Sequence, residues 1–241
     1  MENMLQKMMN RFPLFIGMGF MIVVISLVIG VINTTNAVDY YAVEKVTRET
    51  LQEWAKVRAG VESTSIWLPY FKFFGLAMIL AGITTALGVI ATKLMQMGKE
   101  LIAYVPEQAR LSVPDRPKSV MWMRMFMMMG MLIILAGFIV ALITAGTAAD
   151  LFSNPIAVID TATQGSELLD QLASVHAAES WLEAFKFVGV AFLFIGIVNG
   201  LTSIIFALQY QKKAMPQVVG NLPAADTSIE LRPAPAVGSV M

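Results

Sequence analysis

Four long stretches of this chain contain no charged residue: 12–38, 73–92, 125–149 and 187–211. A helix needs about 20 apolar residues to cross a hydrocarbon core of about 30 Å, and even the shortest of these stretches is long enough. Backbone groups in lipid must be bonded within the protein, and these runs do not alternate as the strands of a barrel do. We therefore predict four transmembrane helices, near 13–34, 67–93, 121–146 and 181–209.

The composition favours an integral membrane protein and argues against several functional classes. Of the 241 residues, 57% are hydrophobic and 14% are charged, whereas soluble domains carry about 25% charged residues. The formal charge is zero, which gives no sign of a nucleic-acid partner. The chain has no cysteine and one histidine, His176, so one chain cannot build a thiolate or His-rich metal site. We predict no cofactor and no catalytic residue.

The second and fourth apolar stretches begin with related sequences. Aligned without gaps, residues 67–90 and 181–204 are identical at 11 of 24 positions. The matched pairs include Trp67 and Trp181, Lys72 and Lys186, Gly75 and Gly189, and Gly82 and Gly196. An internal duplication is the simplest explanation.

The first apolar stretch follows Lys7 and Arg11 and so resembles a secretory signal peptide. However, the apolar region of such a peptide is only about 7–15 residues long. The stretch also has a counterpart later in the chain, because Arg11 and Gly17 have the same spacing as Arg124 and Gly130. We expect this segment to be retained as a transmembrane helix.

Each copy of the repeat contains two crossings, so both copies enter the membrane from the same side. The fold class is thus an all-α integral membrane protein of two parallel-repeat hairpins, related by an axis along the membrane normal. The predicted division is a first two-helix repeat at 1–105, a cytoplasmic linker at 106–120, a second repeat at 121–213 and a mobile tail at 214–241.

The two connections inside the hairpins, 35–66 and 147–180, contain amphipathic patterns. Apolar residues recur every three or four positions in 43–57 and 168–175, which predicts amphipathic helices in both outer loops. Ser65 and Ser180 are expected to cap the second and fourth transmembrane helices.

The distribution of Lys and Arg predicts the orientation. The N-terminal segment, the 94–120 region with Lys93 and Arg124 at its edges, and the C-terminal tail contain eleven of these residues. The 35–66 loop contains four and the 147–180 loop contains none. Both termini should therefore be cytoplasmic, in an inner or plasma membrane.

Lys72 and Lys186 each lie shortly after a tryptophan, Trp67 or Trp181, at the same spacing. The tryptophans are expected at the lipid interface, where each lysine can extend its ammonium group towards the headgroups. The alternative is a pair of charges that bind a ligand inside the bundle.

Small residues recur at equivalent positions of the second and fourth helices, and allow helices to approach closely in lipid. The predicted packing residues are Gly75, Gly82, Ala86, Gly189, Gly196, Gly200 and Asn199. Asn199 and its equivalent Thr85 are expected to bond across helices. A further stripe at Gly137, Ala141 and Ala145 suggests more small-residue surface than one chain can bury.

Seven methionines lie between Met121 and Met131. Thioethers can bind Cu(I), but these residues point all round a helix and have no cysteine or histidine near them in the sequence. We therefore interpret them as flexible apolar packing.

These observations predict a non-catalytic structural or accessory membrane subunit. Its partners would be membrane lipids and either copies of itself, as a homo-oligomer, or a larger membrane complex. The alternative is an oligomeric channel or carrier for an anion or small solute. A membrane enzyme or redox subunit is the third hypothesis.

Overall fold

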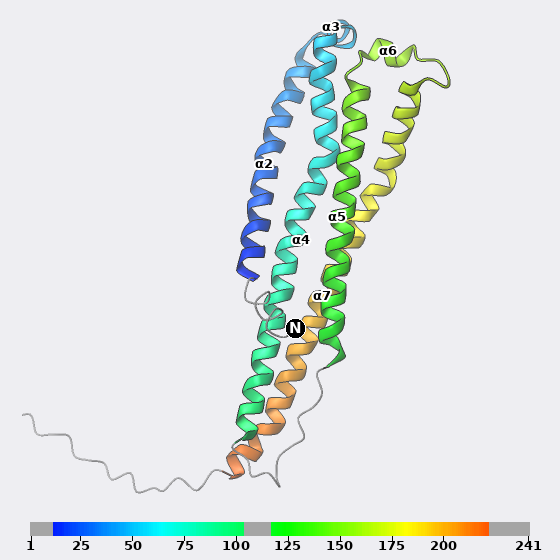
Figure 1. Cartoon of the computed structure of the whole chain (residues 1–241). Helices are drawn as coiled ribbons and strands as arrows, with labels where there is room; N and C mark the ends of the chain where they lie inside the picture. Colours follow the sequence, from blue (N-terminus) through cyan, green and yellow to red (C-terminus); the bar gives the residue numbers. More distant parts are fainter. Residues whose placement is uncertain (1–11, 104–116, 222–241) are drawn as a thin grey trace, which may run out of the picture.

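The computed structural model describes residues 12–103 and 117–221, and this part of the chain is all-helical. Four long helices run side by side, and two short helices lie at one end of the bundle (Figure 1). The helices are α2 (Phe12–Ala42), α3 (Lys45–Thr50), α4 (Gln52–Ala103), α5 (Lys118–Phe152), α6 (Ile156–Asp160) and α7 (Glu167–Asn221). We call the end with α3 and α6 the loop end, and the end where α2 begins and α7 finishes the termini end.

The four long helices are long and apolar enough to cross a membrane. This confirms the predicted all-α chain with four such helices. Two of them are much longer than a crossing requires: α4 has 52 residues and α7 has 55. At 1.5 Å per residue each measures about 80 Å, against about 30 Å for a hydrocarbon core. Both helices continue beyond α2 and α5 at the termini end (Figure 1).

The predicted starts of the second and fourth helices are too late in the sequence. Ser65 lies inside α4 and Ser180 lies inside α7, and neither caps a helix. The Ser65 hydroxyl donates to the carbonyl oxygen of Glu62, and the Ser180 hydroxyl donates to that of Ala177, in the preceding turn. Neither amphipathic segment forms a separate loop helix as expected: 43–57 is divided between α3 and the first turns of α4, and 168–175 lies in the first turns of α7. Pro69 is accommodated inside α4.

Packing at the loop end explains these longer helices. Ala59 and Ile66 of α4 are buried against Ala148 and Leu151 of α5 and against Val175 of α7. An isolated helix gains little stability from its own hydrogen bonds, so such tertiary contacts sustain its outer turns. The Gln52 side-chain amide also donates to the carbonyl oxygen of Ser153 at 2.7 Å. The loop end is therefore a small apolar core of its own.

The helices are not packed symmetrically. α4, α5 and α7 all pack against one another, whereas α2 packs extensively against α4 alone among the long helices. One side of α2 is therefore covered, and much of the rest is exposed and apolar, for example at Phe20, Leu27 and Val31.

At the termini end, α4 and α7 continue as a pair. The Gln211 side-chain amide donates to the carbonyl oxygen of Leu94 at 2.7 Å, and Tyr210 packs against Ile102 and Ala214. Helix α7 runs to Asn221, so the first residues of the predicted mobile tail are helical instead. Residues 1–11, 104–116 and 222–241, which include most of the predicted linker and tail, lie outside the described residues.

Candidate functional site

Glycines hold the first hairpin together. A Cβ atom on Gly75 would lie 2.9 Å from the carbonyl oxygen of Gly19, and one on Gly82 would lie 3.2 Å from that of Phe12. Real Cβ atoms do not approach backbone so closely without a shift of the neighbouring atoms. The residues predicted for packing in α4 therefore serve the contact with α2.

The second hairpin is packed in the same way. A Cβ atom on Gly189 would lie 3.3 Å from the carbonyl oxygen of Gly130, and one on Gly196 would lie 3.4 Å from that of Met123. The structural counterpart of Gly130 is thus Gly19, and not Gly17 as the sequence match indicates. A Cβ on Gly17 would meet nothing within 4 Å.

Among the other predicted packing positions, Gly200 makes close contacts within the chain. Gly200 is buried, and a Cβ there would lie 3.1 Å from the Met123 sulfur and 3.2 Å from Leu87. Ala86 is partly exposed. The Asn199 amide nitrogen donates to the carbonyl oxygen of Ile195 in its own helix, so its expected bond across helices is not seen.

The two equivalent lysines have different surroundings. Lys72 is exposed. The Lys186 side chain is only 13% exposed, and its ammonium lies 3.3 Å from a carboxylate oxygen of Glu183. The same ammonium lies 5.4–5.7 Å from the ring centres of Tyr70, Phe73 and Phe187. Lys186 thus joins α7 to α4 through its cation–π contacts with Tyr70 and Phe73, while its ion pair with Glu183 lies within α7.

The two tryptophans share a local contact but differ in burial. Trp67 packs edge-on against Phe71, and Trp181 does the same against Phe185, in each case one turn along the helix. Trp67 also packs against two buried clusters, whereas Trp181 is 46% exposed. Trp181 is therefore free to contact a surrounding medium, and Trp67 is mainly a packing residue.

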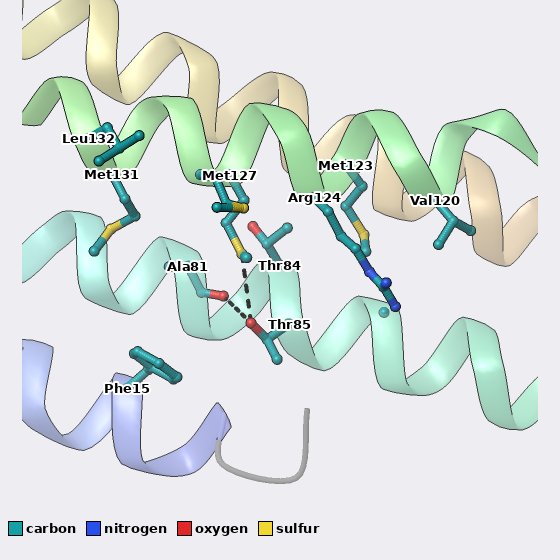
Figure 2. Close-up of a pocket in the computed structure, with 12 residues that line it drawn as sticks. Phe15, Ala81, Thr84, Thr85, Val120, Met123, Arg124, Met127, Met131 and Leu132 are labelled. Carbon is teal, nitrogen blue, oxygen red and sulfur yellow. Dashed lines mark hydrogen bonds between the residues drawn. The ribbon is translucent and has the colours of Figure 1, made fainter. Parts of the chain in front are cut away.

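An apolar groove of about 380 Å³ lies between α2 and α5, with α4 as its floor. Figure 2 shows Phe15 of α2 on one side and the methionines of α5 on the other. The described lining residues are Phe15, Ala81, Thr84, Thr85, Gly88, Val120, Met123, Arg124, Met127, Met128, Met131 and Leu132. We refer to this cavity as the α2–α5 groove. It exists because α2 does not pack against α5.

The polar groups of the groove are at its floor and at one end. The Thr84 and Thr85 hydroxyls donate to the carbonyl oxygens of Leu80 and Ala81 in their own helix, both at 2.8 Å. Thr85 also reaches the Met127 sulfur at 3.7 Å, a contact across helices as predicted (Figure 2). Arg124 extends from α5 towards α4 near the termini end of the groove (Figure 2). The groove thus joins a long apolar surface to one cationic group.

Sequence reasoning missed the groove, although a signal for it was present. Met123, Met127 and Met131 recur at every fourth position, so they form one row on α5, and all three line the groove. The methionine run as a whole does point all round the helix. The methionines nevertheless form separate rows, because Met121, Met125 and Met129 are exposed, whereas Met123, Met127 and Met131 line the groove.

Other candidate groups remain at the surface. His176 is exposed on α7 and lies 3.7 Å from Glu179. Within residues 12–103 and 117–221, no cluster of three or more His, Cys, Asp or Glu side chains is placed to hold a metal ion. Comparison of the chain with protein-family models, curated proteins and solved structures gives no match.

Proposed function

We propose that this protein is a non-catalytic accessory subunit of an inner or plasma membrane, which associates in the bilayer with copies of itself or with a larger membrane complex. In this proposal α2, α4, α5 and α7 cross the membrane, the termini end is cytoplasmic and the loop end faces outward. The excess of Lys and Arg at the termini end supports that orientation.

A parallel repeat is part of the proposal. The support is that Gly19, Gly75 and Gly82 make the contacts in one hairpin that Gly130, Gly189 and Gly196 make in the other. The two hairpins are thus alike in the contacts between their own two helices. Between the hairpins, α5 packs against α4 but α2 has no comparable contact with α7.

The observation that carries the proposed association is the uncovered outer face of α2. Leu14, Gly17, Met18 and Met21 surround a shallow hollow on this face. Four residues with this spacing form the kind of hole that accepts a side chain of a facing helix in knobs-into-holes packing. The exposed Met18 borders this hollow beside Gly17, so in a two-fold pair each copy can place its Met18 in the hollow of the other. A second copy of α2 is therefore its simplest occupant.

The small-residue stripes support association less than the sequence suggests. Gly137, Ala141 and Ala145 are buried inside the chain, so they are not surplus surface. The enclosed ammonium of Lys186 also favours an accessory subunit over an anion channel, since Glu183 and three rings already surround it.

The experiment is a comparison of native mass in lipid discs for the wild type, Gly17→Leu and Gly146→Leu. Both glycines are exposed, and a Cβ on either meets nothing within 4 Å, so neither substitution should disturb the fold. We expect Gly17→Leu to fill the hollow on α2 and lower the assembled fraction, with Gly146→Leu unchanged. A wild type that is a single copy in discs and in gently extracted native membranes would overturn the proposal.

A further inference from the structure

The α2–α5 groove has the shape of an elongated channel. Its α5 wall runs from Val120 to Leu132, and its α4 floor runs from Ala81 to Gly88. At 1.5 Å per residue these walls are about 18 Å and about 10 Å long. Methionine side chains are flexible and adapt to irregular apolar shapes. Such a groove suits one extended hydrocarbon chain better than a planar cofactor.

The chemistry of the lining is apolar except at one end. The Thr84 and Thr85 hydroxyls already donate to carbonyl oxygens of α4, so these two groups offer a ligand in the middle of the groove no hydrogen-bond donor. Among the described residues that line the groove, Arg124 alone is charged. A guanidinium group presents several N–H donors in a plane and suits the oxygens of a phosphate group.

The place of Arg124 in the chain matches this chemistry. It is the last charged residue before the uncharged stretch 125–149, at the end of α5 that begins with Lys118. In a membrane it would therefore lie at the boundary between headgroups and hydrocarbon. From there the groove leads towards Leu132, into the uncharged part of the bundle.

We propose that the α2–α5 groove binds one acyl chain of an anionic membrane phospholipid, whose phosphate group contacts the guanidinium of Arg124. Within the described residues, the first hairpin does not repeat the charge of this site. In the register that pairs Gly19 with Gly130, the counterpart of Arg124 is Pro13, which has no charge. The inference requires the proposed membrane location but not the proposed association.

The test is native mass spectrometry of the purified full chain with phosphatidylglycerol and phosphatidylcholine of identical acyl chains. We expect the wild type to retain one phosphatidylglycerol in preference to phosphatidylcholine. Arg124→Gln should bind it about tenfold more weakly, because a charge-assisted phosphate contact is lost. Lys93→Gln is the matched control, since Lys93 is an exposed cation towards the same end that does not line the groove.

A second measurement locates the acyl chain. Phosphatidylglycerol with a photoreactive group on its acyl chain, in liposomes, should label Phe15, Met128 and Leu132. Thr85→Phe, which narrows the groove from its floor, should reduce this labelling. Equal retention of the two lipids, equal losses in Arg124→Gln and Lys93→Gln, or labelling spread evenly over the outer face of α2 would each overturn the inference. None of these results bears on the native mass that tests association.

Discussion

Gly19 and Gly75 meet where α2 crosses α4, with their backbones in direct contact. A Cβ on Gly19 would lie 2.6 Å from the carbonyl oxygen of Gly75. That atom belongs to a helical backbone and cannot turn aside as the end of a side chain can. Gly19→Ala should therefore separate the helices and lower the free energy of unfolding by about 1–3 kcal/mol, the usual cost of overpacking.

The matched control for this prediction is Gly17→Ala, half a turn earlier on the same helix. A Cβ there meets nothing within 4 Å. Alanine is also the better helix former by about 1 kcal/mol. Gly17→Ala should thus be neutral or stabilising. Unfolding in detergent, followed by circular dichroism, measures both variants, and equal effects would contradict the close contact.

Gly82 and Gly196 are equivalent in sequence but not in the space around them. A Cβ on Gly82 would lie 2.6 Å from the Ile16 side chain and 3.2 Å from the carbonyl oxygen of Phe12. On Gly196 the nearest atoms are at 3.4 Å. Gly82→Ala should destabilise by about 1–3 kcal/mol, whereas Gly196→Ala should lie within about 1 kcal/mol of the wild type. The same unfolding assay decides, and a larger loss in Gly196→Ala would count against the contacts described.

The number of long helices, and their being apolar enough to cross a membrane, were predictable because uncharged stretches of this length allow few other structures. The extent of α4 and α7 was not. Ser65 and Ser180 have the local features of helix caps, and a cap is recognised from a few residues. The turns before them are sustained by a buried cluster that includes Ala59 and Val175, residues far apart in the sequence.

The packing glycines were also predictable, since their repetition marked them. The glycines that they contact were not predictable. The sequence match makes Gly17 the equivalent of Gly130, whereas the packing shows that Gly19 has this position in the first hairpin. The α2–α5 groove exists because α2 makes no extensive contact with α5. The row of Met123, Met127 and Met131 marks one wall of the groove, but no local pattern in either helix shows that α2 leaves this wall uncovered.

Lys186 should contribute to stability where Lys72 does not. The Lys186 ammonium is largely enclosed and lies over three rings, including Tyr70 and Phe73 of the neighbouring helix. Cation–π contacts are worth about 0.5–2 kcal/mol, more where water is excluded. Lys186→Met should therefore lower stability by about 1 kcal/mol, whereas Lys72→Met should change it by less than about 0.5 kcal/mol because Lys72 is exposed.

The ion pair of Lys186 can be separated from its ring contacts with Glu183→Gln. The Glu183 side chain is 70% exposed, and exposed pairs contribute only about 0–1 kcal/mol. We expect a smaller loss in Glu183→Gln than in Lys186→Met, measured by thermal unfolding in the same detergent. If the order is reversed, the ring contacts are not what holds Lys186.

The last prediction concerns orientation. The chain has no cysteine, so an introduced one is the sole thiol. Glu53 and Gln164 are exposed at the loop end, and Met97 is exposed on α4 towards the termini end. If the excess of Lys and Arg keeps the termini end in the cytoplasm, an impermeant thiol reagent added to intact cells should label Glu53→Cys and Gln164→Cys. It should label Met97→Cys only after the cells are opened. Labelling of Met97→Cys alone in intact cells would mean that the chain is inserted the other way round. Labelling of all three in intact cells would mean that the two ends do not lie on opposite sides of a membrane.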